Sequence, residues 1–440
     1  MSAFSAPTPL TQAAGKPAPA SNVHHLMIYF GLAYFAQGIG QAGALINQPL
    51  MYYLKSLGFT TDQVAGFLAV LTVPWIIKPV YGLISDFIPL FGYRRKSYLF
   101  LMNGVAAGGF LWLTGLTAPN MIVWALLLCA LGIASSDVLI DALMVENGQK
   151  TGLIKQFQSQ QWLWFNIAAV ISGLVGGWLT QKIQPASAAL HVAAFVIAFA
   201  PAAVAVATAF LIHEQKATLD LGGLRATTLS LLASLKSRTL WIVAGFIAFW
   251  NFTPSFGTPL FYHMTDHLKF EQDFIGQLSA IASVGAVIGA FVYGRYLAGR
   301  YTTKSLVYVS IVLSAGTTLA YLLLVGKVSA VGLFFTTGIL SMIPFLTVLS
   351  VAAAACPPQA AGFTFAGLMS IYNAAGQLSQ ITGAHLYEKV FLQQINPLIW
   401  VAAIFTLGAF VFVPFLPDTD RSGNETEGLQ QEQGELESKK

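Results

Sequence analysis

Three ionisable side chains fall inside long apolar stretches of this sequence: Lys78, Asp137 and Asp141. An ionisable group among apolar residues is costly unless it is paired or used, so each of the three is a candidate for chemistry. Lys78 and Asp137 lie at nearly the same depth in two stretches that run in the same direction. Each is about four residues past the middle of its stretch, or about 6 Å along the helix axis towards the cytoplasm. A buried ion pair between these two side chains is therefore geometrically possible.

Asp137 and Asp141 are four residues apart, so they share one face of a helix. Two neighbouring carboxylates repel each other, and this repulsion favours uptake of a proton, which leads to the hypothesis of proton coupling at the pair. In the alternative hypothesis the two residues are structural: Asp137 neutralises Lys78, and Asp141 anchors the basic run at 94–96. The two hypotheses overlap, and the sequence leaves both open.

Neutral polar side chains favour particular apolar stretches. In each set of three stretches, the first two carry most of the Asn and Gln residues and the third is nearly free of them. This pattern is expected if every third helix faces lipid and the others line a cavity, although an ordinary interhelical hydrogen bond is the alternative for any single residue. The candidates for solute binding are, with Asp137 and Lys78, the residues Gln37, Gln41, Gln161, Trp162, Asn166, Asn251, Tyr372, Asn373 and Gln377.

The composition of the whole chain explains how such groups come to lie in apolar surroundings. Of 440 residues, 9% are charged and 56% are hydrophobic, whereas about a quarter of the residues in a soluble domain are charged. A soluble enzyme, a nucleic-acid binder and a disordered scaffold are excluded. The sequence predicts a multi-pass protein of the lipid bilayer.

Twelve apolar stretches are long enough to cross a bilayer, which takes about 20 residues. We therefore predict an all-α membrane protein with twelve transmembrane helices in two pseudo-symmetric six-helix bundles. Pro254 and Pro259 should loosen the seventh helix. The stretches cover about 26–47, 63–84, 98–117, 121–143, 158–180, 188–212, 239–261, 274–297, 305–325, 329–351, 362–386 and 395–416.

The longest connection separates the two predicted bundles. We predict a disordered N-terminal tail over 1–22, a first bundle over 23–212, a cytoplasmic linker over 213–238, a second bundle over 239–416 and a disordered acidic tail over 417–440. With both termini in the cytoplasm, most Lys and Arg residues fall on the cytoplasmic side, as is typical of membrane proteins. The exceptions are Lys78 within a span and five lysines outside: Lys55, Lys182, Lys269, Lys327 and Lys389.

A glycine-punctuated basic loop follows the second helix of each half. The first loop contains Gly82, Asp86, Gly92, Arg94, Arg95 and Lys96, and we predict that it takes part in gating. The second runs from Gly294 through Arg300 to Lys304. A parallel repeat of two six-helix halves is the architecture of many secondary transporters.

These motifs carry a family resemblance. The motifs Gly82-Leu-Ile-Ser-Asp86 and Gly92-Tyr-Arg-Arg-Lys96 resemble the loop signature of the major facilitator superfamily. The longer stretch from Lys78 to Lys96 is similar to that of the folate–biopterin transporter family. Three further stretches agree: Asp137-Val-Leu-Ile-Asp141-Ala, Pro254 through Gly276, and Cys356-Pro-Pro followed by Leu368 through Asn373.

The resemblance covers essentially the whole membrane body and implies a carrier of folates, pterins or, in some members, S-adenosylmethionine. One departure is Gln359, which follows Cys-Pro-Pro where the family pattern has an acidic residue. A pterin presents two parallel N–H donors that suit the carboxylate of Asp137, and the glutamate tail of folate needs a cation such as Lys78. Aromatic side chains such as Trp75, Trp162 or Tyr372 could stack on the ring.

We therefore expect a monomeric secondary transporter of the cytoplasmic (inner) membrane that moves a small-molecule solute by alternating access, with a proton as coupling ion. A permease for muropeptides or another organic solute is the alternative within the superfamily. A non-transporting receptor or membrane enzyme is the alternative of another class. We expect no enzyme activity, cofactor, metal or nucleic-acid partner, because no catalytic, nucleotide-binding or metal-binding motif occurs.

Overall fold

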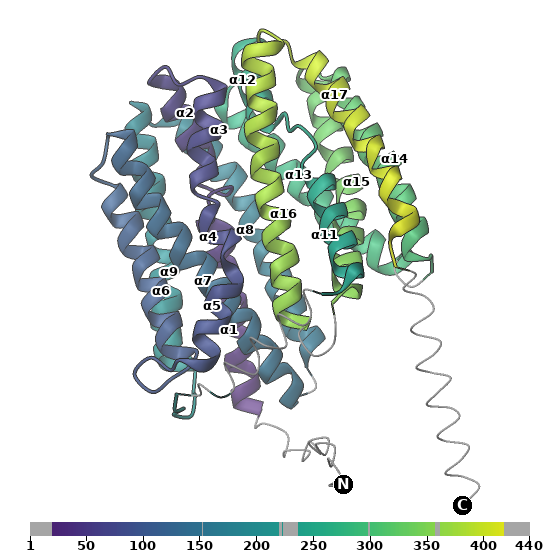
Figure 1. Ribbon diagram of the computed structural model, residues 1–440. Helices are drawn as coiled ribbons and strands as arrows, with labels where there is room; N and C mark the ends of the chain where they lie inside the picture. The colour runs from purple at the N-terminus through teal and green to yellow at the C-terminus, as the bar shows by residue number, and fades with distance from the viewer. Residues whose placement is uncertain are drawn as a thin grey trace, which may run out of the picture.

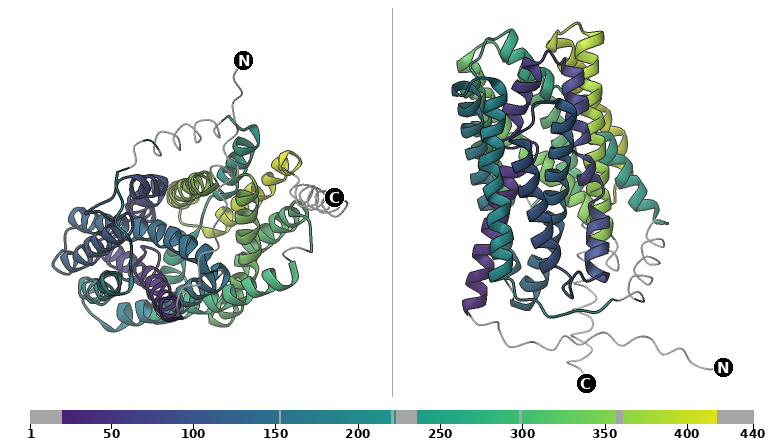
Figure 2. Two further views of the ribbon diagram at one scale, coloured as in Figure 1. Left: turned by 90° about the horizontal axis from the view of Figure 1, so that it is seen from below. Right: turned by 90° about the vertical axis from the view of Figure 1, so that its left-hand side faces the viewer.

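Helices make up every named element in the part of the chain that the structure describes. The structure is a computed structural model, and it describes residues 20–151, 153–219, 222, 236–297, 300–356 and 361–417. The predicted tails therefore lie outside the described residues, apart from 20–22 and 417, and so does most of the predicted linker. Figure 1 shows the helices packed side by side in one bundle, and Figure 2 shows the same bundle from below and from one side.

The N-terminal half contains nine helices that follow one another along the described chain. They are α1 (Ala20–Gly40), α2 (Asn47–Ser56), α3 (Thr61–Val70), α4 (Val73–Ile76), α5 (Lys78–Phe87), α6 (Lys96–Leu113), α7 (Pro119–Thr151), α8 (Ile154–Lys182) and α9 (Ala186–Leu211).

The C-terminal half begins after the linker. Its α-helices are α11 (Arg238–Asn251), α12 (Gly257–Asp266), α13 (Gln272–Val292), α14 (Thr303–Ala320), α15 (Lys327–Ala354), α16 (Ala361–His385) and α17 (Ile395–Leu407). Short π- or 3₁₀-helical turns extend several of them: η1 (Tyr293–Leu297), η2 (Tyr321–Leu323), η4 (Leu386–Val390) and η5 (Gly408–Phe415).

The prediction of an all-α membrane protein is confirmed. In the described residues, seven helices are long and apolar enough to cross a membrane unaided. Each of the twelve predicted stretches coincides with a helix or with consecutive shorter helices, so the arrangement is consistent with twelve spans.

Three of the predicted spans are interrupted rather than continuous. The second is divided into α3, α4 and α5, and the seventh into α11 and α12 by residues 252–256. In the first, predicted over 26–47, α1 ends at Gly40 and a turn occupies 41–46, and α2 then extends the helical region to Ser56, beyond the predicted end.

Pro254 lies within the interruption of the seventh span, whereas Pro259 lies in the first turn of α12, so the span is loosened at Pro254 and not at Pro259. Proline lacks the N–H that continues a helix, so the backbone groups of this segment need other partners.

Helix α16 supplies partners for the interrupted seventh span. The N–H of Ser255 donates to the carbonyl of Ser379 at 3.2 Å, and the hydroxyl of Ser379 donates back to the carbonyl of Thr253. Gly383 permits this approach, since a Cβ at that position would lie 1.7 Å from the carbonyl oxygen of Ser255. The interruption is therefore clamped onto α16 at polar backbone groups.

Glycines also bring the two halves together. Gly173 and Gly177 of α8 face Gly276 of α13, and a Cβ on any of the three would lie within 3.0 Å of backbone atoms of the opposite helix. Small residues allow helix backbones to approach closely in a membrane. We call this contact the α8–α13 seam.

The apolar core differs between the two ends of the molecule. We call the end where α1 begins the basal end, and the opposite end, which carries α2 and α12, the distal end (Figure 1). Towards the distal end one apolar cluster includes residues of both halves, such as Leu54 and Phe261. Towards the basal end each half has its own cluster, one around Phe30 and Phe157 and the other around Phe246. The halves are thus joined distally and packed separately at the basal end.

Candidate functional site

Lys78 and Asp137 form an ion pair inside the N-terminal half. The ammonium group of Lys78 donates to Oδ2 of Asp137, and only 7% of the Asp137 side chain is exposed. The Lys78 ammonium also lies over the ring of Trp75, 4.4 Å from its centroid. A cation held between a carboxylate and an aromatic face is stabilised by both. The pair expected from the depths of the two residues is therefore present.

The interruption of the second span places the lysine. Trp75 belongs to the single turn α4, Lys78 is the first residue of α5, and Pro79 follows at a position where proline suits the start of a helix. The short spacing between the two helices brings the indole ring and the ammonium group together. Asp137 comes from α7, which packs against both α4 and α5.

Helix α1 contributes two further polar contacts to α7. The amide of Gln37 donates to Oδ1 of Asp137 at 2.6 Å, and the hydroxyl of Tyr34 donates to Asp141. Asp137 thus has a partner on each carboxylate oxygen. A small pocket of about 10 Å³ lined by Gln37 and Asp137 lies beside the pair. That volume is about what one water molecule needs.

Three glutamine side chains carry buried atoms that lack a hydrogen-bond partner within the described residues: Oε1 of Gln37, Nε2 of Gln161 and Oε1 of Gln377. Gln161 is only 1% exposed. Buried polar atoms nearly always have a partner, so these amides are suited to bind water or a solute. They come from α1, α8 and α16, which belong to both halves.

In the C-terminal half, Asn251, Tyr372 and Asn373 lie around the interrupted seventh span. The amide of Asn251 donates to the backbone carbonyl of Tyr372, which joins α11 to α16. The amide of Asn373 donates to the carbonyl of Trp75 at 3.3 Å and so connects the two halves next to Lys78. Trp75 is therefore in contact with both the ion pair and the opposite half.

The other predicted solute-binding residues are not brought to the ion pair by a hydrogen bond within the described chain. The amide of Asn166 donates to the carbonyl of Trp162 in its own helix at 2.7 Å. The ring of Trp162 packs edge-on against Tyr34 with centroids 6.5 Å apart. Gln41 lies in the turn after α1, and its backbone N–H donates to the carbonyl of Gln37.

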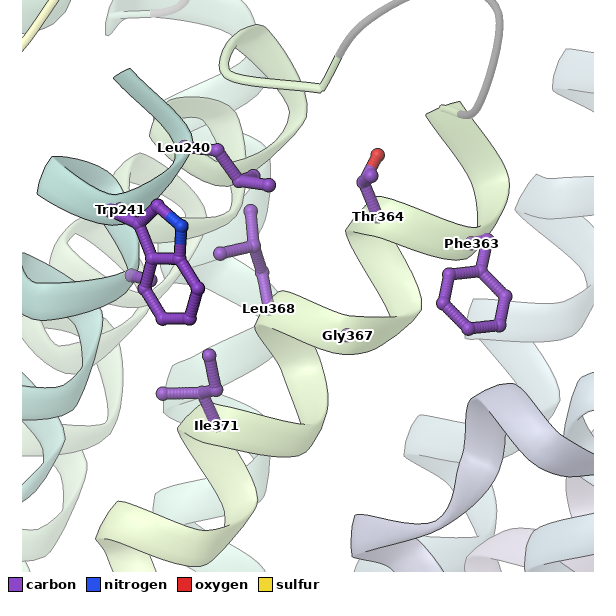
Figure 3. A pocket seen from close by; sticks show the side chains of 8 residues that line it. Leu240, Trp241, Phe363, Thr364, Gly367, Leu368 and Ile371 are labelled. Atoms are coloured by element: carbon purple, nitrogen blue, oxygen red, sulfur yellow. The ribbon is translucent and has the colours of Figure 1, made fainter. Parts of the chain in front are cut away.

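An apolar pocket of about 130 Å³ lies between α11 and α16 (Figure 3). Its walls include Leu240, Trp241 and Leu368, whose side chains lie together between the two helices, whereas Phe363 lies on another side of α16. None of the predicted solute-binding residues lines this pocket, so it is separate from the ion pair.

The predicted gating loop forms a network around Arg95 at the basal end. Its guanidinium group pairs with Asp86 at 2.6 Å and with Glu146 at 2.8 Å, and it donates to the hydroxyl of Ser85 at 3.1 Å. The structure does not support the alternative hypothesis that Asp141 anchors this basic run. Its hydrogen-bond partner is Tyr34, and it is Glu146, five residues later in α7, that reaches Arg95.

Glu214 is a residue of this network that the sequence did not point to. Its carboxylate accepts hydrogen bonds from the backbone N–H groups of Arg94, Arg95 and Lys96, at distances of 2.8–3.1 Å. These are the groups at the start of α6, where a negative charge is favourable. A carboxylate just after α9 thereby fixes the loop, and only its position at the end of a span could have suggested it.

The glycines of the loop have different roles. Gly92 has φ of +83°, a left-handed conformation that glycine adopts without strain. Gly82 faces α7, where a Cβ would lie 3.4 Å from the side chain of Val138. Gly92 therefore shapes the turn, whereas at Gly82 a Cβ would make only an ordinary van der Waals contact with α7.

At the distal end, polar contacts connect the two halves. Both oxygens of Asp266 accept from the Lys55 ammonium at 2.8 Å, and that ammonium lies 4.7 Å from the centroid of the Tyr262 ring. The hydroxyl of Tyr262 donates to the carbonyl of Phe59 at 2.6 Å. Further contacts join Gln48 to Gln272, Gln181 to Gln272 and Thr61 to Glu388.

Comparisons with known proteins agree on one family. A sequence model of the BT1 family matches residues 37–432. A folate-biopterin transporter of Synechocystis sp. (strain ATCC 27184 / PCC 6803 / Kazusa) is 30% identical in an alignment of 402 residues that covers 87% of this chain and 79% of the relative. Probable folate-biopterin transporter 4 of Arabidopsis thaliana is 24% identical, over 81% of this chain and 87% of the relative.

Solved structures of transporters share the fold. The nucleoside transporter NupG superposes with a TM-score of 0.67 at 16% identity, covering 90% of this chain and 98% of NupG. A D-xylose-proton symporter gives a TM-score of 0.67 at 12% identity, covering 91% and 98%. At such low identities the similarity establishes the fold alone, which is that of the major facilitator superfamily.

Proposed function

Because this chain belongs to the BT1 family, we propose that it moves a folate- or pterin-like solute across the cytoplasmic membrane by alternating access. The chain is a multi-pass membrane transporter and not an enzyme. The identity of the solute, the coupling ion and the residues that bind them are proposed.

The proposal is supported chiefly by the cluster of Lys78, Asp137, Gln37 and Trp75. A pterin ring presents two parallel N–H donors, and a carboxylate offers the two acceptors that match them. The indole ring of Trp75 offers a face for stacking, and the Lys78 ammonium can pair with a carboxylate of a folate tail. Solute binding would therefore replace the Lys78–Asp137 pair with two new pairs.

Buried amides from the opposite half complete the proposed site. Asn373 already contacts the backbone of Trp75, and Gln377 lies one helical turn further along α16 with an oxygen that has no partner in the described chain. Amides provide both donors and acceptors, as a heterocycle with an alternating hydrogen-bond pattern requires. In this proposal the N-terminal half supplies the charges and the C-terminal half supplies neutral hydrogen bonds.

The two ends of the molecule suggest which way the site opens. Polar contacts and a shared apolar cluster join the halves at the distal end, whereas the clusters of the basal end are separate. We infer that the distal end is closed in this state and that transport requires its opening. The predominance of basic residues in the basal loops supports placing that end, with both termini, in the cytoplasm.

We infer that the halves 23–212 and 239–416 rock against each other around the central site, joined by the linker 213–238. Asp137 and Asp141 are the proposed proton acceptors. Both carboxylates lie within α7, and each accepts a hydrogen bond from a side chain of α1. The transporter is proposed to act as a monomer, because the site lies between the two halves of a single chain.

Uptake into proteoliposomes tests this function. Purified protein should accumulate labelled folate, and excess biopterin should compete. Asp137→Asn should abolish uptake because an amide has one acceptor oxygen, and its NH₂ group would face the second N–H of the pterin. Thr347→Val, a buried polar substitution in α15 that removes a hydrogen bond to the carbonyl of Ile343 at 2.8 Å, provides a control away from the proposed site and should leave uptake unchanged. Competition by an anhydro-muropeptide and not by pterins would instead establish the alternative permease function.

A further inference from the structure

A groove on the outer side of the α8–α13 seam has no role in the proposed transport mechanism. It has a volume of about 340 Å³ and lies between Leu174, Val175 and Trp178 of α8 and Asp273 and Gln277 of α13. This volume is in the range of small-ligand sites, about 300–1,000 Å³. One wall is apolar and the other carries a carboxylate and an amide, so the groove suits an amphipathic ligand.

The groove faces lipid rather than the interior of the protein. On α13, the exposed side chains Val284, Ile288 and Phe291 follow one another at spacings of three and four residues, which places them on one face. On α8, Leu174 and Trp178 are likewise exposed, at 45% and 54%. In a multi-pass membrane protein, exposed apolar faces of this kind are covered by lipid.

Asp273 and Gln277 continue the exposed face of α13 towards the distal end. Successive positions in the series 273, 277, 284, 288 and 291 are three, four or seven residues apart, which corresponds to about one or two helical turns. Polar side chains on a lipid-facing stripe are unusual and call for a partner. Gln277 lies five residues into the helix, about 7.5 Å from its start. The span Gln272–Leu297 has 26 residues and is about 39 Å long, against about 30 Å of hydrocarbon, so a bilayer centred on it would place Gln277 close to the boundary between headgroups and acyl chains.

The charge of Asp273 indicates which lipid fits. Within the described part of the chain, no basic side chain forms an ion pair with Asp273, whereas its neighbour Glu271 pairs with Lys327 at 3.6 Å. One oxygen of Asp273 accepts from the backbone N–H of Phe274 at 2.7 Å, which leaves the other oxygen for a ligand. A carboxylate at the membrane surface attracts a cation, and a primary ammonium group can also donate hydrogen bonds to it.

We propose that this groove binds a phospholipid with a primary ammonium headgroup, such as phosphatidylethanolamine. The ammonium group pairs with Asp273, the amide of Gln277 donates to a phosphate or ester oxygen, and an acyl chain packs on Leu174 and Trp178. Trp178 is well suited to this position, since its ring prefers the interface between headgroups and acyl chains.

Binding of the lipid would also depend on the conformational state of the transporter. The two walls of the groove belong to different halves, and they are held together by the Gly173, Gly177 and Gly276 contacts of the seam. Separation of α8 from α13 would divide the groove, so the lipid binds only the distally closed arrangement. A ligand that binds one state stabilises that state in proportion to its differential affinity.

Thermal unfolding of the detergent-purified full chain tests the proposal without any transport assay. Phosphatidylethanolamine should raise Tm above the value with phosphatidylcholine of the same acyl chains by about 2 °C or more. Asp273→Asn should remove this difference and keep the bond to Phe274, because the asparagine oxygen is also an acceptor. Glu271→Gln is the matched control and should retain the full difference.

Equal Tm values with the two lipids in the unaltered protein would overturn the proposal, and so would a difference that survives Asp273→Asn. A stronger effect of phosphatidylglycerol, whose headgroup has no cation, would also contradict it. Because the readout is lipid binding, failure here is distinguishable from failure of the transport proposal.

Discussion

At the scale of single residues, the ion pair of Lys78 and Asp137 could be predicted because helix direction and rise per residue fix the depth of each side chain. The partners on α1 could not be predicted in the same way. The depth of a residue along its helix does not determine which neighbouring helix its side chain faces. The contacts of Gln37 and Tyr34 with α7 therefore follow only from the packing of the helices.

The same limit explains the incorrect alternative for Asp141. Asp141 and Glu146 are separated by five residues, or about 7.5 Å along α7, and this distance decides which of them reaches the basic loop. Glu146 pairs with Arg95 near the basal end, and Asp141 lies deeper, next to Tyr34. The role of Glu214 was missed because a single acidic residue in a connection carries no signal of its own.

At the scale of elements, the apolar stretches predicted where helices lie but carried little information on where they break. Pro254 of the seventh span indicated a loosened helix, and the interruption at 252–256 contains it. The turn at 41–46 contains no proline, and only its glycine and small residues distinguish it from a continuous helix. Backbone partners on other helices determine whether such a break is stable.

A glycine substitution tests the clamp between α16 and the interrupted seventh span. Gly383→Ala should lower Tm strongly, because its Cβ would lie 1.7 Å from a backbone oxygen of Ser255 and the helices would have to separate. Overpacking of this kind costs about 1–3 kcal/mol. The measurement is thermal unfolding of the purified protein.

Gly316→Ala is the control for that substitution. Gly316 lies within α14, and a Cβ added there would have open space around it, with no neighbouring atom of the described chain within 4 Å. Alanine at this position should therefore leave Tm unchanged or slightly raised, since alanine favours a helix more than glycine does. Equal effects of the two substitutions would show that the contact with Ser255 does not constrain α16.

At the scale of the whole molecule, composition and the twelve stretches predicted a multi-pass membrane protein, and the repeated basic loops with their family resemblance added the transporter fold. They could not indicate its state, because closure of one end depends on contacts between residues far apart in the sequence. Lys55 and Asp266 are separated by 211 residues, yet their side chains meet at 2.8 Å. Such pairs determine which end of the molecule is closed.

Cross-linking tests whether the distal end must open. Cysteines at Lys55 and Asp266, joined by a short reducible bis-thiosulfonate, should reduce solute uptake at least about tenfold, because the halves could no longer separate there. A reductant should restore uptake. Uptake at the unmodified rate with the cross-link in place would exclude distal opening from the transport cycle.

The matched control joins cysteines at Glu271 and Lys327. These two residues also form an ion pair, but both belong to the C-terminal half. A cross-link within one half should leave uptake unchanged, since the two halves can still move as units.

The central claim is that the Lys78–Asp137 pair recognises the solute, and equilibrium binding by three purified variants tests it most directly. Lys78→Met should bind biopterin normally but folate at least about tenfold more weakly, since only folate has a carboxylate tail and a lost charge-assisted contact costs this much or more. Asp137→Asn should lose both ligands.

The double variant Lys78→Met/Asp137→Asn removes both charges together, so it folds without an unpaired buried charge and separates binding from stability. Its binding of both ligands should be lost while Tm stays close to that of the unaltered protein. The expected results are ligand-selective loss on removal of Lys78 and general loss on removal of Asp137. Unchanged affinity of Asp137→Asn for both folate and biopterin would contradict the role of the pair in recognition.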